Sequence, residues 1–381
     1  MNSLIMSSEA VTEGNLNKIC DLIADLILNS YLEKDENSIV LVDVIINDKF
    51  LFVIGSIYSK VTIDVKNIIK EHENLIINNQ KINELEIILN IDYYENNNEI
   101  IFHNFEQGLI FGYACNETLE FMPYSVIYSQ RLARMLFNYM IKNKNKFANY
   151  DGKVQINVEY KNNKLYRIDS IIIYINYLKN KLNEIEKNMI IENIKKIMNE
   201  KLIDINTRIM INSTTQNIIY NECISTGISG RNNFNNLYGG YSRYVSCSLC
   251  GRNPIKIEKS ATYMSRFIAK NLVATGLINK VEIGLNYEFG SLEPNSIIVN
   301  SYGQKFDSGM ITSDDIIIMI KKIFPLNIKE IIKLFDLNNV KYLKNTNYGY
   351  FENENSPWDQ LNYVKKIKSY FTKEKGIIFL D

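Results

Sequence analysis

Strand-like alternation of apolar and polar residues occurs in three separate parts of this chain, and a helical pattern follows each time. In the first part, β-rich runs from Ser38 to Val44 and from Phe50 to Tyr58 flank the turn Asn47-Asp48-Lys49, and Asp64 opens a helix. A period of two is typical of strands with one buried face, and aspartate is a common cap at the start of a helix. The pattern therefore predicts a β-hairpin followed by a helix.

The second part repeats this order with longer elements. Apolar residues alternate from Val154 to Tyr160, a turn follows at 161–164, and Leu165–Tyr174 forms the return strand. A long amphipathic helix is then predicted from about Lys181 to Leu202. Its apolar face consists of Leu182, Ile185, Met189, Ile194, Ile197 and Met198.

The third part runs from Val281 to Tyr287, turns through Gly290–Pro294, returns through Ile297–Val299 and leads to a helix capped near Ser313. Three such units predict an α+β fold with three structurally similar domains, in which helices cover one face of each sheet. The other face of each sheet is then free to contact a neighbouring subunit. Chance likeness among common hairpins is the alternative explanation of the repeat.

Charge and composition exclude several kinds of partner. The chain has 43 basic and 43 acidic residues, so it lacks the cationic surface that nucleic-acid binding needs. Its first residues show no basic segment before an apolar run, and no later stretch approaches the roughly 18 apolar residues of a membrane span. We therefore expect a cytoplasmic protein that contacts neither nucleic acid nor membrane.

The cysteines do not suggest a disulfide framework, because the chain has five of them, an odd number, spread from Cys20 to Cys250. Only Cys247 and Cys250 have the spacing of metal ligands. Zinc would require two further ligands, and the histidines His72 and His103 lie far away in sequence with no second pair of cysteines. Two ordinary thiols are the favoured interpretation.

Short motifs that follow one another along nearly the whole chain provide the most specific signal. The first is Ser8-Glu9-Ala10-Val11-Thr12-Glu13-Gly14, followed by Lys18-Ile19-Cys20-Asp21. Later motifs are Gln107 to Ala114, Asp151-Gly152-Lys153, Gly227 to Arg231, Tyr238-Gly239-Gly240, Lys259 to Val273, Glu293-Pro294, Tyr348-Gly349 and Pro357-Trp358. In content and order this series resembles the S-adenosylmethionine synthetase (methionine adenosyltransferase) family, and we identify the chain as a divergent member of it.

The resemblance implies three α+β domains in a pseudo-threefold arrangement, which we expect at residues 1–100, 101–215 and 216–381. It also implies a dimer that forms through flat sheet faces, with each active site built from both chains. Members of the family join ATP and methionine into S-adenosylmethionine and then cleave the released tripolyphosphate. That chemistry requires cations around the phosphate chain and carboxylates that hold magnesium, and the family also uses a potassium ion.

One half of the family's site is largely replaced in this chain. Where the family has His-Pro-Asp-Lys, this chain has Asn15-Leu16-Asn17-Lys18, so an imidazole and a metal-binding carboxylate are lost. Asn17 offers magnesium only a neutral oxygen, which is a weaker ligand than a carboxylate. Arg231 remains in place as a phosphate ligand, with pairing to a carboxylate as the alternative, and the lysine that follows it in the family is Asn232.

Positions for the other ligands have also changed. By ungapped counting, the family's adenine-stacking aromatic residue falls at Asn217, a methionine-binding aspartate at Ser225 and a glutamate at Ser56. None of these residues offers the ring or the carboxylate of the family. The loop that closes over methionine is shortened to Glu95–Glu99, and His103-Asn104-Phe105 replaces glycines before the family's Asp-Gln-Gly motif.

The other half of the site keeps the sign of its charges. Four positions do so: Glu106, Arg252, Lys256 and Glu258. By resemblance, the catalytic candidates are Lys18, Lys153, Arg231, Arg252 and Lys256, with Asn15 at the family's histidine position. The candidates for binding ATP are Glu106, Asp151, Lys153, Arg231 and Ile297. The metal candidates are Glu258 and Asp43, with Asn17 as a weak third, for Mg²⁺ and K⁺ whose retention the substitutions put in doubt.

This division suggests a degenerate subunit that works with an intact synthetase paralogue, because pairing would join the surviving half of this chain to the complete half of its partner. A stand-alone enzyme of low activity or altered specificity is the first alternative. A scaffold that binds no nucleotide is the second, and the missing adenine contact favours it. ATP and methionine are the expected ligands in the first two cases.

Overall fold

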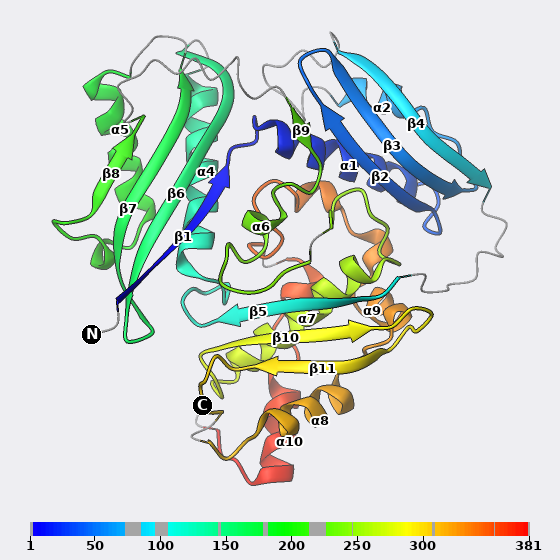
Figure 1. The fold of residues 1–381 in the computed structure, drawn as a ribbon, viewed down its shortest axis with the longest axis vertical. Helices are drawn as coiled ribbons and strands as arrows, with labels where there is room; N and C mark the ends of the chain where they lie inside the picture. Colours follow the sequence, from blue (N-terminus) through cyan, green and yellow to red (C-terminus); the bar gives the residue numbers. More distant parts are fainter. Residues whose placement is uncertain are drawn as a thin grey trace.

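The computed structural model describes residues 3–72, 85–95, 106–143, 146–177, 182–212, 226–245, 247–306, 309–353 and 355–379. Figure 1 shows three sheets around the middle of the molecule, each with helices packed behind it. The predicted α+β fold with three sheet-and-helix units is confirmed.

The first sheet contains the first predicted hairpin. Its strand order is β4-β3-β2-β9, and β2 pairs with β3 in antiparallel register from Ile39 to Ile46. Asn47 Oδ1 closes the turn by accepting hydrogen bonds from the backbone nitrogens of Lys49 (2.9 Å) and Phe50 (2.7 Å). Helix α1 packs against β2, and Asp64 caps α2 as predicted. The bounds are β2 Ile39–Ile46, β3 Phe50–Ser59, β4 Glu86–Glu95, β9 Gly227–Ile228, α1 Leu16–Leu32 and α2 Val65–Glu71.

The central sheet has the order β1-β6-β7-β8 and is built around the second predicted hairpin. The first strand of the chain pairs antiparallel with β6, from Ser3↔Lys161 to Val11↔Lys153. Helix α4 packs against β6 and β1, and α5 packs against α4. The bounds are β1 Ser3–Val11, β6 Phe147–Lys161, β7 Lys164–Tyr177, β8 Arg208–Ile211, α4 Tyr124–Lys142 and α5 Glu184–Ile197.

Helix α5 is shorter than predicted, and the prediction of its apolar face was right for Leu182, Ile194 and Met198 but wrong for Ile185 and Met189. Asn183 forms a capping box with Glu186, so the helix begins after Asn183 and ends at Ile197, not near Leu202. Ile190 and Ile194 are buried, whereas Ile185 and Met189, predicted on the apolar face, are 73% and 50% exposed. Residues four positions apart lie on one helix face, and the buried face of α5 contains Glu186, Ile190 and Ile194.

The third sheet has the order β11-β10-β5, and β5 and β10 lie against helix α7. Gly112 of β5 permits this packing, because an added Cβ would lie 2.1 Å from the Ser265 backbone carbon of α7. The helix after the third hairpin is capped by Thr312, one residue before the predicted Ser313. The bounds are β5 Gly108–Cys115, β10 Lys280–Tyr287, β11 Pro294–Asn300, α6 Asn233–Asn236, α7 Ile257–Ala274, α8 Ser313–Ile323, α9 Ile328–Phe335 and α10 Val364–Lys375.

Each sheet combines strands from distant parts of the chain. Strand β1 joins β6 of the central sheet, β5 joins β10 of the third sheet, and β9 joins β2 of the first sheet. The chain therefore crosses repeatedly between the three units. The expected domain boundaries near residues 100 and 215 lie outside the described residues.

Helix α7 runs through the middle of the core, and nearly all of its residues are buried. It nevertheless carries cations, and both Arg266 and Lys270 pair with the buried Asp359, at 3.3 and 2.9 Å. Pairing of this kind offsets the cost of removing a charge from water. Among the described helices, none combines the length and the apolar character that a membrane crossing requires.

Candidate active site

The guanidinium of Arg252 lies beside strand β2. Its Nη1 donates to the Val42 carbonyl at 2.5 Å, and its Nη2 donates to Asp43 Oδ2 at 2.6 Å. Ser229 Oγ donates to Oδ1 of the same aspartate at 3.2 Å. Gly251 permits the close approach, because its φ is +66° and an added Cβ would lie 2.5 Å from the Val42 oxygen. Two candidates from the sequence, Asp43 and Arg252, are therefore in direct contact.

The start of helix α7 brings three more candidates together. Lys256 caps the helix, and its Nζ forms an ion pair with Glu106, which precedes β5. Glu258 lies in the first turn of α7, and its carboxyl group is hydrogen-bonded to that of Glu106. Burial and then the contact with Glu106 raise the pKa of Glu258 to about 7. Lys256 thus lies next to two adjacent carboxyl groups, those of Glu106 and Glu258.

Cys247 links these two contacts. Burial raises the pKa of its thiol to about 12, and the charges of Glu258, Arg252 and Glu106 all act on it. We call the set Asp43, Glu106, Arg252, Lys256 and Glu258 the charged cluster. It contains a pair of adjacent carboxyl groups, which are the hard oxygen ligands that Mg²⁺ prefers, and two cations of the kinds that bind phosphate.

A second group of candidates lies where β1 passes into α1. Asn15 caps α1 by accepting a hydrogen bond from the Asn17 nitrogen at 3.2 Å, and its Nδ2 donates to Asp151 Oδ1 at 3.1 Å. Burial raises the pKa of Asp151. Lys153 Nζ pairs with Glu9 Oε2 at 2.6 Å across the β1–β6 ladder. Asn15 therefore hydrogen-bonds within the fold at the position where the family has a histidine.

Asn17 contacts strand β9, and Arg231 follows that strand in the chain. Asn17 Oδ1 accepts a hydrogen bond from the Ile228 nitrogen at 3.0 Å, so the amide anchors β9 to α1. The next turn is held by Asp21, whose Oδ1 accepts from the Gly230 nitrogen at 2.7 Å. The Arg231 side chain is exposed, and no ion pair joins it to any other described residue. Among the described residues of this second group, Arg231 is the one cation that is available to bind a ligand.

Two candidates place their side chains in the core. Lys18 is 2% exposed, and its Nζ donates to Asn236 Oδ1 at 2.8 Å and to the Thr346 carbonyl at 3.0 Å. Burial lowers the pKa of this ammonium group. Ile297 is 8% exposed and pairs with Leu285 between β11 and β10. In this chain Lys18 joins α1 to the C-terminal segment, and Ile297 packs in the third sheet.

The remaining positions at which this chain departs from the family are partly described by the structure. Ser56 lies opposite Leu41 on the β2–β3 hairpin, and Asn232 is buried. Asn217, Ser225, residues 96–99 and His103-Asn104-Phe105 lie outside the described residues. The sequence did not single out Glu9, Ser229 or Cys247 as parts of the site. Glu9 and Ser229 carried a signal, because they belong to the first motif and to the motif Gly227 to Arg231, and Cys247 was noted only for its spacing from Cys250.

Comparison with known proteins identifies the family of the chain. Residues 3–98, 104–217 and 219–360 match the N-terminal, central and C-terminal domains of S-adenosylmethionine synthetase, respectively. The S-adenosylmethionine synthase of Syntrophobacter fumaroxidans is 32% identical over 387 residues, which cover 97% of this chain and 98% of the relative. The synthases of Clostridium tetani and Mesoplasma florum are 31% and 32% identical, and each comparison covers 96% of this chain and 99% of the relative. The chain belongs to the S-adenosylmethionine synthetase family.

Proposed function

We propose that this chain is a subunit that supplies one half of a composite site for S-adenosylmethionine formation, with an intact synthetase chain supplying the other half. The observation that carries the proposal is the different state of two groups that meet at the contact between Ser229 and Asp43. The charged cluster keeps its cations and carboxylates together, whereas the group around Asn15 and Asn17 has exchanged charged side chains for amides that hydrogen-bond within the fold.

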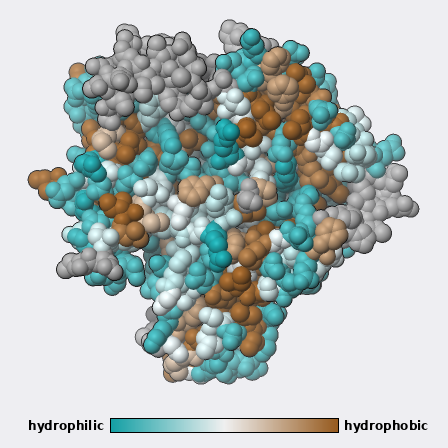
Figure 2. Space-filling model, viewed as in Figure 1, coloured by the Kyte–Doolittle hydropathy of each residue, from teal (hydrophilic) through white to brown (hydrophobic). Residues whose placement is uncertain are grey.

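The outer face of the first sheet supports assembly with a second chain. Along β2, Ile39, Leu41 and Ile45 point away from the helices and are only partly covered, while the valines at positions 40, 42 and 44 are buried. Figure 2 shows apolar residues gathered over β2–β4. A sheet with two apolar faces is typical of one that is covered on both sides. We therefore assign this outer face to a partner, either a second copy or an intact paralogue.

The charged cluster is part of the same surface. Asp43 lies between Leu41 and Ile45 on the same face of β2, so its carboxylate emerges on the apolar outer face. Arg252, which pairs with Asp43, is 21% exposed there. A partner that covers the sheet would thus also cover the cluster and exclude water from it. Removal of water strengthens the attraction between these cations and a polyphosphate chain.

The residues fit the family's cofactors unequally. Glu106 and Glu258 have the chemistry to hold Mg²⁺, which when bound would offset the phosphate charge. Asp43 already faces the guanidinium of Arg252, so its position suits an ion pair better than K⁺. Asn17 uses its amide oxygen to hold Ile228, which makes it a poor metal ligand. In the proposed reaction Arg252 and Lys256 bind the triphosphate and stabilise the charge that builds up as it leaves.

A complementation assay tests the proposal. An intact synthetase whose own counterparts of Arg252 and Lys256 are changed to alanine is mixed with this chain, ATP, methionine, Mg²⁺ and K⁺, and S-adenosylmethionine is measured. We expect the mixture to form product where neither chain does so alone. Arg252→Ala in this chain should abolish the effect, and Arg208→Ala, on the central sheet, should preserve it.

The other outcomes distinguish the alternatives. Product from this chain alone would overturn the proposal and establish a stand-alone enzyme that uses the exposed Arg231. Absence of product both alone and in mixtures, with a folded complex confirmed by light scattering, would also overturn it and leave a scaffold.

A further inference from the structure

A large polar pocket lies at the end of the third sheet that is remote from the charged cluster. Its volume is about 930 Å³, and it is bounded by residues 115–117, the β6–β7 turn at 162–165, residues 276–280 before β10 and residues 304–305. In Figure 1 this is where the β6–β7 turn approaches the end of β5. The volume is within the range of about 300 to 1,000 Å³ that small-molecule sites occupy.

Strand geometry separates this pocket from the candidate active site. Glu106 precedes β5, whereas Cys115 ends that strand and lines the pocket. A strand rises about 3.3 Å per residue, so the pocket lies roughly 25 to 30 Å from the charged cluster along β5. A ligand in the pocket would therefore not touch Lys256 or Arg252.

The lining is cationic. Lys164, Lys280 and Lys305 reach the pocket from three different segments, and none of them forms an ion pair with another described residue. Glu117 is the one carboxylate in the lining, and it is turned into the protein. Its Oε2 accepts hydrogen bonds from the Tyr124 nitrogen at 3.0 Å and from the Tyr160 hydroxyl at 2.8 Å.

Hydrogen bonds between the segments hold the walls in place. The backbone nitrogen of Asn116 donates to the Asn279 carbonyl at 2.9 Å, and its side-chain Nδ2 donates to Asn279 Oδ1 at 2.8 Å. The Asn279 nitrogen in turn donates to Gln304 Oε1 at 3.3 Å, which leaves the amide Nε2 of Gln304 available as a donor. A pocket whose walls are linked in this way loses little entropy when a ligand binds.

We propose that this pocket binds a small molecule that carries a phosphate or polyphosphate group. Among the described lining residues, three lysines outnumber the single carboxylate of Glu117, so the lining carries a net positive charge that attracts an anion with more than one charge. The polar amides around them provide hydrogen bonds to phosphate oxygens. The volume exceeds what a single inorganic phosphate requires, so the ligand extends beyond its charged group.

Pyrophosphate is the probe for a titration that isolates this pocket. The full chain carrying Arg252→Ala and Lys256→Ala is used as the background, because these changes remove the phosphate-binding cations of the charged cluster. Calorimetry should detect binding of pyrophosphate to this background. Adding Lys164→Ala and Lys280→Ala should weaken binding by more than about tenfold, which is about 1.4 kcal/mol.

A matched control removes the same amount of charge elsewhere. Lys195→Ala and Lys196→Ala change two exposed lysines of α5 in the same background, and the dissociation constant should stay within about twofold of the background value. Equal weakening in both double variants, or no binding to the background, would overturn the proposal. Circular dichroism confirms that each variant is folded, and a pyrophosphate soak of crystals should place density between Lys164 and Lys280. Because the background lacks both cations of the charged cluster, the result is independent of the proposed synthetase function.

Discussion

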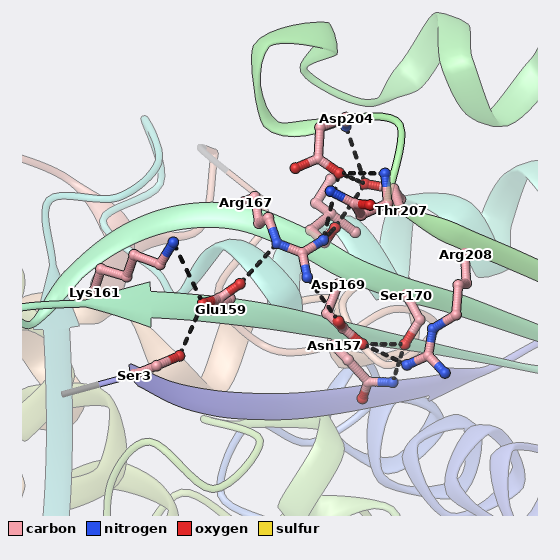
Figure 3. A network of polar contacts seen from close by, with 12 residues as sticks. Ser3, Asn157, Glu159, Lys161, Arg167, Asp169, Ser170, Asp204, Thr207 and Arg208 are labelled. Carbon is pink, nitrogen blue, oxygen red and sulfur yellow. Dashed lines mark hydrogen bonds and ion pairs between the residues drawn. The ribbon is translucent and has the colours of Figure 1, made fainter. Parts of the chain in front are cut away.

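The outer faces of the first and central sheets differ in the residues that dominate them. On the first sheet, β3 exposes Phe50, Phe52 and Ile54 on the side away from the helices. On the central sheet, Figure 3 shows Arg167 of β7 between Glu159 and Asp169, with bonds of 2.7 and 2.9 Å. Both sheets bury an apolar inner face, so the difference lies only in what each leaves outside.

This difference indicates which face needs a partner. The charged side chains of the central sheet neutralise one another, with Arg208 also bonded to Asp169 at 2.8 Å and Ser3 to Glu159 at 2.8 Å. The part of the face that this network covers is stable in water. The apolar side chains on the outer face of the first sheet cannot form ion pairs with one another. Burial against another chain is the main way in which they would lower the free energy.

The largest effect is expected from a charge placed on the apolar face. Phe52→Asp should weaken association with a second copy or with an intact synthetase by more than about 100-fold, because an unpaired carboxylate would be buried in the interface. Analytical ultracentrifugation measures the change. Ile185→Asp, on the exposed side of α5, is the matched control and should leave association unchanged. If both variants associate as the unchanged chain does, the apolar face is not the interface.

A smaller effect on stability is expected when the shared cation of the central sheet is removed. Arg167→Met should lower the free energy of unfolding by about 2 kcal/mol, since Glu159 and Asp169 would face each other without a cation between them. Urea unfolding followed by circular dichroism gives the value. An unfolding midpoint equal to that of the unchanged chain would show that the network contributes nothing.

Low pH should remove the difference in unfolding free energy between the unchanged chain and Arg167→Met. Hydrogen bonds from Ser3 and Arg167 lower the pKa of Glu159, and the hydrogen bond from Arg208 lowers the pKa of Asp169. Groups with a lowered pKa in the folded state stabilise it above their unfolded pKa, and this contribution is lost as the pH falls through the folded pKa. The stability gap between the unchanged chain and Arg167→Met should therefore be full at pH 6 and shrink below about pH 4. A gap that stays constant down to about pH 3 would assign it to packing.

The smallest effect is expected at the rim of the same network. The side chain of Arg208 is 64% exposed, so Arg208→Met should change the free energy of unfolding by less than about 0.5 kcal/mol. The same urea series measures it. A loss as large as that of Arg167→Met would mean that the network acts as a unit in which the exposed cation matters as much as the central one.

Much of the fold was predictable because local patterns and turn chemistry agree in this chain. The hairpin at Asn47 follows from alternating apolar residues and from an amide that bonds to the two nitrogens after it. Prediction was wrong for α5, where Ile185 and Met189 fit an apolar stripe as well as Ile190 does. Only the packing of α5 against its neighbours selects the stripe, since periodicity does not say which face meets the core.

The candidate site was predictable in the identity and charge of its residues but not in their contacts. Glu106 and Lys256 are paired although 150 positions separate them, and Asp43 meets Arg252 only because β2 and the segment at Gly251 run side by side. Lys18 shows the limit most clearly. The motif that contains it resembles a phosphate-binding element, yet its ammonium group is buried and bonded to Asn236 and Thr346.

By itself, the sequence determined the family, the three α+β units and the replacement of one half of the site by neutral amides, because these depend on residue type and order. Tertiary structure alone decided that the charged half is gathered beside an apolar sheet face, that Lys18 belongs to the core, and that three lysines from separate segments line one pocket. Burial and pairing depend on which distant segments meet, and no local pattern in the chain contains that information.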